Sequence, residues 1–309
     1  MGAGVRIAIA SGKGGTGKTT IAASLALSLA HAAASNGAGS PPPLVLDCDV
    51  EAPNAHLFLR PTFTERRDAG ILIPRVDEGR CSHCGRCAQV CQYHAIAVLG
   101  KSVLVFPQLC HGCGSCRCQC PEGAITEHLE AMGVLERGAA RDGLAFARGV
   151  LNVGQPMAVP VIRELKRWAA PQAGQAVILD ASPGTACPVV ETLRGADFLL
   201  LVTEPTPFGL HDLRLAAGVA RELGLPAGVV VNRDGVGDTD IDGFCAAENL
   251  PILMRIPYER RIAEGVARGL TLVDIDRAYA PRFINLFARV KALVNPAAFC
   301  EAVNDSSAG

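Results

Sequence analysis

The sequence has almost no net charge and no hydrophobic run long enough to cross a bilayer. Its 29 basic and 30 acidic residues leave a formal net charge of −1 over 309 residues, so composition gives no reason to expect nucleic-acid binding. The longest strongly apolar run, Phe198–Val202, has the length of a β-strand, whereas a membrane-spanning helix needs about 20 apolar residues. We therefore expect a cytoplasmic protein that binds neither nucleic acid nor a membrane.

Cysteine is present, but it is unevenly distributed. Of the 13 cysteines, nine fall within residues 81–120, which argues against the evenly spaced disulfide bonds of a small secreted protein. In a reducing compartment these side chains are free thiols that can bind metal. The composition therefore indicates one concentrated metal-binding segment in an otherwise ordinary globular chain.

Short apolar runs alternate with helical patterns along most of the chain, which predicts an α/β fold with a parallel sheet covered on both faces. Residues 77–128 interrupt this alternation, so we expect one α/β domain in two parts, 1–76 and 129–309, with an inserted domain at 77–128. The expected strands are 5–10, 44–47, 176–180, 198–203, 228–232 and 252–256, the expected helices are 18–34, 161–168, 210–223 and 277–294, and a hairpin is expected at 96–99 and 103–106.

A glycine-rich segment between the first expected strand and helix matches the P-loop pattern. Its glycines leave backbone N–H groups free to surround phosphate oxygens, and the helix N-terminus adds a partial positive charge. Lys18 is expected to contact the β- and γ-phosphates of ATP, and the Thr19 hydroxyl is expected to bind Mg²⁺. The phosphate-binding residues predicted here are Gly12, Lys13, Gly14, Gly15, Thr16, Gly17, Lys18, Thr19 and Thr20.

Two further expected strands end at aspartates. Asp47 ends one strand and is followed closely by Asp49, and Asp180 ends another. The carboxyl ends of parallel strands share one edge of the sheet, where the P-loop also lies. We therefore expect Asp47 and Asp180 to bind Mg²⁺, and Asp180 with Pro183 and Gly184 to form a γ-phosphate-sensing segment. An aspartate after a strand can also cap the next helix.

Two cysteine runs share the spacing Cys-x2-Cys-x2-Cys-x3-Cys of bacterial ferredoxins. Three closely spaced thiolates can hold one [4Fe–4S] cluster while the fourth points to its neighbour, so the ligand sets are expected to be crossed. Zinc ribbons also use Cys-x2-Cys pairs, but two identical four-cysteine runs favour clusters. The expected sets are Cys81, Cys84, Cys87 and Cys120 for one cluster and Cys91, Cys110, Cys113 and Cys116 for the other, with Cys118 as a spectator.

Over residues 5–62 and 145–295 these motifs resemble the MinD/ParA-type ATPases, a deviant Walker A group that includes the nitrogenase iron protein. The early lysine, Lys13, is the signature of that group. The resemblance implies a P-loop NTPase fold, Mg²⁺-dependent ATP hydrolysis and a homodimer closed by ATP. In that dimer Lys13 contacts the phosphates of the other subunit.

The same resemblance implies roles for individual residues. Asp49 corresponds to the aspartate that positions or activates the attacking water, so Lys13, Lys18 and Asp49 are the expected catalytic residues. Asn232 corresponds to an asparagine that contacts adenine, and Pro257 to a residue beside the base. With its cysteine runs, the chain is similar to MinD-superfamily ATPases that carry an inserted ferredoxin-like α+β domain with two [4Fe–4S] clusters.

The remaining cysteines have weaker assignments. Cys187 follows the γ-phosphate-sensing segment, and in the nitrogenase iron protein a cysteine in a comparable place holds a cluster shared between subunits. No second cysteine accompanies it here, so we expect it to be a small residue at the start of a helix. Cys48, Cys245 and Cys300 are expected to be buried as small apolar side chains.

Three functions fit these motifs. In the first, ATP hydrolysis is coupled to electron transfer through the clusters toward an unidentified redox partner. In the second, the clusters sense redox state and regulate an ATP-dependent dimer that recruits or positions another protein. The third is an Fe–S cluster carrier, which complete ferredoxin motifs disfavour because they suit retained clusters. The motifs alone do not rank the first two.

Overall fold

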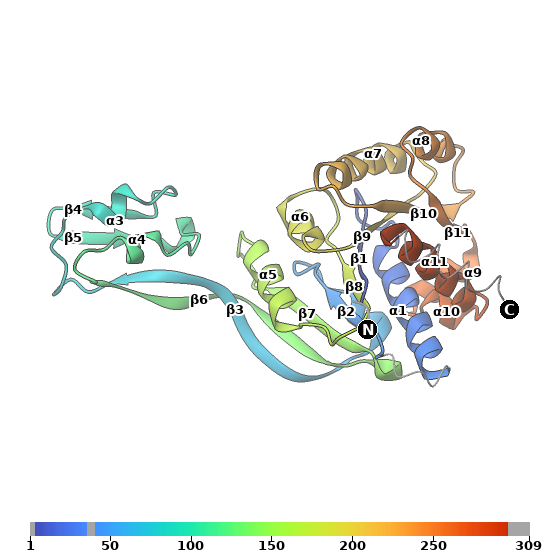
Figure 1. Cartoon of the computed structure of the whole chain (residues 1–309), viewed down its shortest axis with the longest axis horizontal. Coiled ribbons are helices and arrows are strands. Elements are labelled where there is room, and N and C mark those ends of the chain that lie inside the picture. Colours follow the sequence, from blue (N-terminus) through green and yellow to red (C-terminus); the bar gives the residue numbers. More distant parts are fainter. Residues whose placement is uncertain (1–3, 36–40, 296–309) are drawn as a thin grey trace.

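The computed structural model describes residues 4–35 and 41–295, which form an α/β body, a two-stranded arm and a small unit at the far end of the arm (Figure 1). One nine-stranded sheet has the order β11-β10-β9-β1-β8-β2-β7-β6-β3, and its strands from β11 to β7 are parallel. These parallel strands are β1 Arg6–Ala10, β2 Leu44–Asp47, β7 Ala145–Leu151, β8 Val177–Asp180, β9 Phe198–Thr203, β10 Ala227–Asp234 and β11 Ile252–Pro257.

Helices cover both faces of the parallel part of the sheet. Ile7 and Ile9 of β1 belong to one buried cluster, and Ala8 and Ala10 belong to the other. Side chains alternate along a strand, so a strand covered on both faces is apolar throughout. The first cluster includes residues of α1 Lys18–Ser35, α2 Ala55–Leu59, α9 Arg260–Ala267, α10 Leu272–Ile275 and α11 Tyr279–Val294, and the second includes residues of α5 Val159–Trp168, α6 Cys187–Leu193, α7 Pro207–Glu222 and α8 Ile241–Ala247.

The strands and helices that the sequence predicts for the body are all present, and their ends agree with the predicted ranges to within three residues. The predicted α/β fold around a parallel sheet is therefore confirmed. The sheet is mixed at one edge, however, because β6 (Ile125–Ala139) is antiparallel to β7, and β3 (Thr62–Val76) is antiparallel to β6. The sequence analysis predicted none of these three strands.

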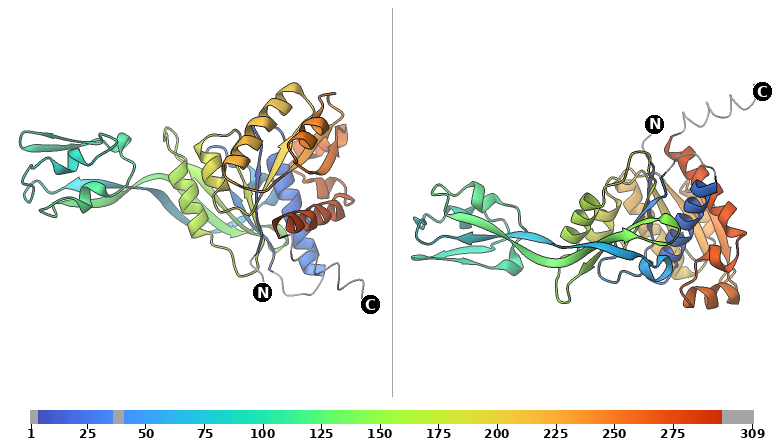
Figure 2. Two further views of the ribbon diagram at one scale, coloured as in Figure 1. Left: turned by 45° about the horizontal axis from the view of Figure 1, so that its top comes forward. Right: turned by 90° about the horizontal axis from the view of Figure 1, so that it is seen from below.

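The strands β3 and β6 are 15 residues long each and continue beyond the body as the arm (Figure 2). Between them the chain forms the small unit, which contains the expected hairpin as an antiparallel pair. A short 3₁₀ helix, Arg141–Gly143, joins β6 to β7. The elements of the small unit are α3 Arg86–Gln89, β4 Ile96–Leu99, β5 Ser102–Val105, a 3₁₀ helix Pro107–Leu109 and α4 Ser115–Cys118.

The last described helix, α11, packs against α1 through a stripe of large apolar residues. Phe283, Leu286 and Val290 are fully buried, at the three- and four-residue spacing of one helix face. None of the helices in the described ranges is long and apolar enough to cross a membrane. In this structure the stripe on α11 is a packing surface of the core.

Truncation of that stripe should destabilise the body. Phe283→Ala is expected to lower the free energy of unfolding by about 3–5 kcal/mol, because it leaves a cavity where a fully buried ring was. Leu293→Ala on the same helix, at a side chain that is 40% exposed, should cost less than about 1 kcal/mol. Urea denaturation followed by circular dichroism measures both. Equal costs for the two variants would contradict this assignment of the helix faces.

Candidate nucleotide and metal sites

The glycine-rich loop turns between the end of β1 and the start of α1. Gly15 and Gly17 have φ angles of 80° and 95°, in the left-handed region that glycine adopts without strain. A side chain at Gly17 would lie 2.4 Å from Asn232 Nδ2, and this amide donates to the Thr16 carbonyl over 2.7 Å. The end of β10 is thereby fastened to the loop.

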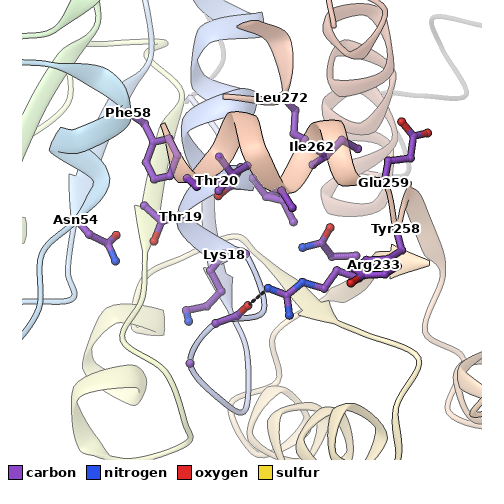
Figure 3. Close-up of a pocket in the computed structure, with 18 of the residues that line it drawn as sticks. Lys18, Thr19, Thr20, Asn54, Phe58, Arg233, Tyr258, Glu259, Ile262 and Leu272 are labelled. Carbon is purple, nitrogen blue, oxygen red and sulfur yellow. Dashed lines mark hydrogen bonds between the residues drawn. The ribbon is translucent and has the colours of Figure 1, made fainter. Parts of the chain in front are cut away.

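A cavity of about 440 Å³ opens beside the loop (Figure 3), within the size range of small-molecule sites. Phe58, Ile262 and Leu272 form an apolar wall on the side away from Lys18. Of the residues predicted to bind ATP, Gly14, Gly15, Gly17, Lys18, Thr19, Thr20, Asn232 and Pro257 line this cavity, together with Asp49 and Pro183, whereas Gly12, Lys13 and Thr16 do not.

Asp180 is fully buried at the end of β8. Within the described part of the chain, neither of its carboxylate oxygens has a hydrogen-bond partner. Burial raises the pKa of Asp180 to about 7, although the nearby Thr19 hydroxyl and the charge of Lys18 act to lower it, and burial also lowers the pKa of Lys18. An unpartnered buried acid carries a free-energy cost that a cation can remove, so these residues fit the predicted magnesium site with Thr19.

Asp47 shapes the loop that presents Asp49. It pairs in register with Asp180 on the neighbouring strand, which confirms that both acids lie at one edge of the sheet. Its carboxylate accepts hydrogen bonds from the backbone N–H groups of Asp49 (3.2 Å) and Ala55 (3.0 Å). Asp49 lines the cavity and Asp47 does not. The structure thus gives Asp47 a loop-fixing contact, and its direct role at magnesium stays a prediction.

Lys13 points away from the cavity toward an acid that the sequence analysis missed. Its Nζ lies 2.6 Å from Glu204 Oε1, while Arg233 Nη1 lies 3.1 Å from Glu204 Oε2. Arg233 Nη2 also donates to the Gly15 carbonyl over 3.0 Å. The Glu204 carboxylate therefore joins the early lysine to the arginine that supports the loop.

Glycine and backbone contacts also place the remaining loop residues. A side chain at Gly12 would lie 2.3 Å from Asp212 Cβ, so α7 approaches the loop too closely for any other residue. Gly184 has a φ angle of 95°, and its N–H donates to the Ser11 carbonyl over 2.9 Å. The predicted phosphate-sensing segment therefore lies directly against the start of the loop.

The two predicted cysteine sets line two separate cavities in the small unit. Cys81, Cys84, Cys87 and Cys120 line one cavity, and Cys91, Cys110, Cys113 and Cys116 line the other. Each cavity thus takes three cysteines from one run and the fourth from the other run, and the crossed ligation of clusters stays a prediction. The twelve cysteines in the described residues are all free of disulfide bonds.

Backbone N–H groups donate to cysteine sulfurs in the same pattern in both runs. At the first cysteine of each run, His83 N–H donates to Cys81 Sγ and Gly112 N–H donates to Cys110 Sγ, each over 3.4 Å. At the last cysteine of each run, Ala95 N–H donates to Cys91 Sγ over 3.3 Å, and Ala124 N–H donates to Cys120 Sγ over 3.4 Å. Hydrogen bonds to cluster sulfurs are one of the ways in which a protein tunes an iron–sulfur centre.

The backbone repeats this internal symmetry. Gly85 and Gly114 have φ angles of 77° and 75° at the start of α3 and α4. His83 adopts a φ of 55° where the second run has Gly112 at 62°. The two runs are therefore folded as near-equivalent loops, with a histidine in a position that favours glycine.

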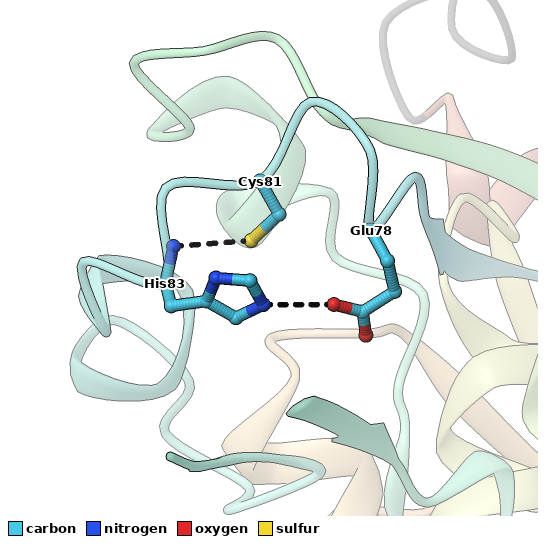
Figure 4. A group of neighbouring side chains, drawn as sticks. All are labelled: Glu78, Cys81 and His83. Carbon is cyan, nitrogen blue, oxygen red and sulfur yellow. Dashed lines mark hydrogen bonds and ion pairs between the residues drawn. The ribbon is translucent and has the colours of Figure 1, made fainter. Parts of the chain in front are cut away.

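The cysteine sets are too open for a preformed zinc site. Four thiolates at a Zn–S distance of about 2.3 Å would place their sulfurs about 3.8 Å apart. Within residues 4–35 and 41–295, however, the only trio of candidate ligand atoms closer than 4.8 Å is Glu78, Cys81 and His83 (Figure 4). In that trio His83 Nε2 is paired with Glu78 Oε2 at 2.9 Å. The wider sets fit a larger group such as a cluster.

The other cysteines lie mostly where the sequence predicts. Cys48 and Cys245 are buried, as expected, whereas Cys118 and Cys187 are exposed, and Cys118 lines neither of the two cavities in the small unit. Cys187 is the first residue of α6, as the sequence predicts. Cys300 lies outside the described residues.

Several residues in or near the nucleotide cavity were not predicted. Glu204 directly follows β9, so the same signal that identified Asp47 and Asp180, an acid at the end of a strand, could have found it. Asn54 lines the cavity, and its buried Oδ1 has no hydrogen-bond partner among the residues that the structure describes. No comparable signal marks the apolar wall, because its residues come from segments far apart in the sequence.

Together the glycine-rich loop before α1, the acids at the ends of adjacent parallel strands and the cavity beside them define a P-loop nucleotide-binding protein. A family model for the CobQ/CobB/MinD/ParA nucleotide-binding domain, CbiA, matches residues 7–273. The chain therefore belongs to this family, and the predicted MinD/ParA-type membership is confirmed.

Sequence and structural relatives agree with the family. The uncharacterized protein MJ0579 of Methanocaldococcus jannaschii is 30% identical over 270 residues, or 85% of this chain and 89% of the relative. The septum site-determining protein MinD of Pyrococcus horikoshii, solved with Mg-ADP, superimposes with a TM-score of 0.54 at 19% identity, over 91% of this chain and 93% of that one. The MinC:MinD cell division complex of Aquifex aeolicus superimposes with a TM-score of 0.54 at 17% identity, over 93% of this chain and 96% of that one. These two structures share the fold.

Proposed function

We propose that this protein is an ATPase whose nucleotide cycle controls electron transfer through two [4Fe–4S] clusters. One observation carries the proposal: the two cavities of the small unit are lined by the two crossed cysteine sets. That unit is carried on strands of the same sheet that holds the nucleotide cavity. A single chain would then contain both an energy source and an electron path.

For the nucleotide, the proposal assigns the phosphates to the loop and magnesium to Thr19 and Asp180. The orphaned, buried carboxylate of Asp180 supports the magnesium assignment, and the MinD structure from Pyrococcus horikoshii is described with Mg-ADP. Asp49 lies on the cavity wall, where it can orient the attacking water. The adenine would lie near Asn232 and Pro257.

For the clusters, the proposal assigns four thiolates to each cavity, with backbone N–H donors already directed at two sulfurs of each set. Bound clusters of this type supply one-electron transfer at low potential. The chain itself provides the ligands, the donors that tune them and the arm that positions them. The physiological electron donor and acceptor would be other proteins.

The proposed enzyme is an ATP-closed homodimer. Lys13 is bound to Glu204 of its own chain, yet about a third of its side chain is exposed, so it can exchange this partner for another. In the dimer, ATP in the other subunit would replace Glu204 as the partner of Lys13. Closure of the dimer would in this way depend on nucleotide.

An EPR-monitored redox titration with and without MgATP tests the coupling. We expect the midpoint potential of at least one cluster to change when MgATP binds to the anaerobically reconstituted wild-type protein. Lys18→Met should retain the nucleotide-free potentials and lose the change. Identical potentials in the wild type with and without MgATP would contradict coupling to electron transfer.

The same preparation tests the redox-sensing alternative. If the clusters regulate the ATPase, the rate of ATP hydrolysis and the extent of dimerisation should differ between oxidised and reduced protein. Steady-state hydrolysis assays and light scattering, both performed anaerobically, measure these quantities. Transfer of iron and sulfide to an apo-protein would instead favour the cluster-carrier function.

A further inference from the structure

The arm leaves the body at a β-bulge. Ala69 pairs with Gly133 and Gly70 pairs with Ala131, so Met132 is an extra residue on β6. The pairing of β6 with β7 also begins at Gly133, which means that the three-stranded sheet becomes a two-stranded ribbon at this point. Bulges bend and twist the strand pair that contains them. The arm therefore bends away from the body at this bulge, and Gly70 and Met132 are called its hinge.

The packing at the bulge leaves little room for other residues. A side chain at Gly70 would lie 1.9 Å from the Glu130 carbonyl oxygen, so the two strands approach each other closely there. Met132 is buried in the same apolar cluster as Val161 and Leu165 of α5. A side chain at the next residue, Gly133, would lie 3.2 Å from Val161 Cγ2, so the bulge packs against α5.

Polar contacts fasten α5 to β3 and β6 as well. Glu164 Oε1 lies 3.0 Å from Arg67 Nη2, and Glu164 Oε2 accepts from the Gly70 N–H over 3.4 Å. The guanidinium carbons of Arg67 and Arg137 lie 5.1 and 4.5 Å from the centre of the Trp168 ring. Arg137 Nη1 also donates a hydrogen bond to the Trp168 carbonyl over 3.1 Å. One face of α5 therefore holds β3 and β6 on the body side of the hinge, and Glu164 contacts the hinge itself at Gly70.

Other side chains of α5 hold α6. Lys166 Nζ donates to the carbonyl oxygens of Glu191 (2.6 Å), Thr192 (3.0 Å) and Arg194 (2.6 Å). Arg163 forms two hydrogen bonds of 3.1 Å with the Glu191 carboxylate. A lysine on the last carbonyl groups of a helix is a favourable cap. The end of α6 and the middle of α5 are thereby joined as one unit.

The nucleotide site reaches the hinge by two routes, one through α6 and α5 and one through the end of β7. In the first, α6 begins at Cys187, three residues after Gly184, which is bonded to the start of the P-loop. In the second, Val50, the residue after Asp49, accepts from the Leu151 N–H over 2.8 Å, and the next residue, Asn152, donates from its N–H to the Met132 carbonyl over 2.8 Å. Both segments expected to respond to ATP are thus within a few contacts of the hinge.

We propose that α5 transmits the nucleotide state to the arm, so that a displacement of α6 swings the cysteine-rich unit about the Gly70–Met132 bulge. This inference rests on the proposed function for the nucleotide, but it concerns the geometry of the arm and not the clusters' chemistry. From Gly70 to Val76 the arm extends about 20 Å at 3.3 Å per residue. A rotation of about 10° at the hinge then moves its end by about 3 Å.

A pair of nitroxide labels measures this motion. Because the chain has 13 cysteines, the labels are introduced through a noncanonical amino acid at two exposed positions, Leu99 in the small unit and Leu215 on α7. Pulsed dipolar EPR is recorded with the clusters oxidised and diamagnetic, without nucleotide and with a slowly hydrolysed MgATP analogue. We expect the distance distribution of the wild type to shift by about 3 Å or more on nucleotide binding.

Two variants separate transmission from folding. Lys166→Met, at the α6 side of α5, and Glu164→Gln, at the arm side, should each lose at least half of the shift while nucleotide affinity stays within about twofold of wild type. Arg221→Met, which removes the surface ion pair with Glu248, is the matched control and should keep the full shift. Thermal unfolding confirms that each variant is folded.

The outcomes are distinguishable from those of the proposed function. Transmission through α5 is wrong if the wild type binds nucleotide and the distance between the two labels does not change. It is also wrong if nucleotide shifts this distance in Lys166→Met and Glu164→Gln as much as in the wild type. A full shift in distance with unchanged cluster potentials would instead contradict the coupling to electron transfer and leave the mechanical inference intact.

Discussion

ATP turnover should fall by about 10²–10³-fold or more in Lys18→Met, because preorganised cationic groups at a transferring phosphoryl group contribute that much to the rate. Lys18 is only 7% exposed, and its charge is held between the loop and the carboxylates of Asp180 and Asp49. Methionine keeps the length of the side chain and removes the charge, so the loop should retain its shape. Phosphate release measured at saturating MgATP reports the loss.

The colour of the protein and its iron content should not change in Lys18→Met, since the nucleotide cavity and the cysteine-lined cavities share no residue. The matched control is Lys291→Met, which removes an exposed lysine from α11 and should leave turnover within about twofold of wild type. Wild-type turnover in Lys18→Met would show that the glycine-rich loop is not the phosphate site. Loss of colour would show that the two parts depend on each other for folding.

The sequence was sufficient to predict the body of the fold because its strands are short, apolar and covered on both faces. Segments such as 198–203 contain no polar residue before the final threonine, and such runs fit few alternatives. The strands β3 and β6 are different, because β3 is exposed and rich in charge over residues 65–68, just before the arm begins. Their stability comes from pairing with each other, a non-local property that neither segment shows alone.

The residues of the candidate sites also fall into a group that local sequence spacing predicts and a group that only the fold brings together. The loop at 12–19 and the cysteine runs have local spacings imposed by the chemistry of phosphate and of metal clusters, so the sequence predicted their residues directly. Glu204 and Arg233, which hold Lys13 and the loop, come from neighbouring strands β9 and β10. Their meeting depends on strand order, which the sequence analysis did not predict. The hinge contacts of α5 depend in turn on the arm, which was not predicted at all.

Iron content distinguishes a ligand cysteine from a spectator two residues away. The wild type should hold about eight irons per chain, four from each cluster. Cys116→Ser should lower this to about four, because Cys116 lines the second cavity and the first cavity keeps all four of its cysteines. Cys118→Ser should keep about eight, because Cys118 is exposed and lines neither of these cavities. Iron and sulfide analysis of anaerobically reconstituted protein measures all three.

The pair of variants also tests the crossed assignment. Burial raises the pKa of the Cys116 thiol to about 11, so without metal this side chain is protonated at neutral pH and iron must displace the proton. Serine is far less acidic and cannot replace the thiolate as readily. In the crossed scheme Cys91→Ser should remove the same cluster as Cys116→Ser, although Cys91 belongs to the other run, and their EPR spectra should coincide. If Cys91→Ser instead gave the spectrum of Cys84→Ser, each run would hold its own cluster and the crossed sets would be wrong.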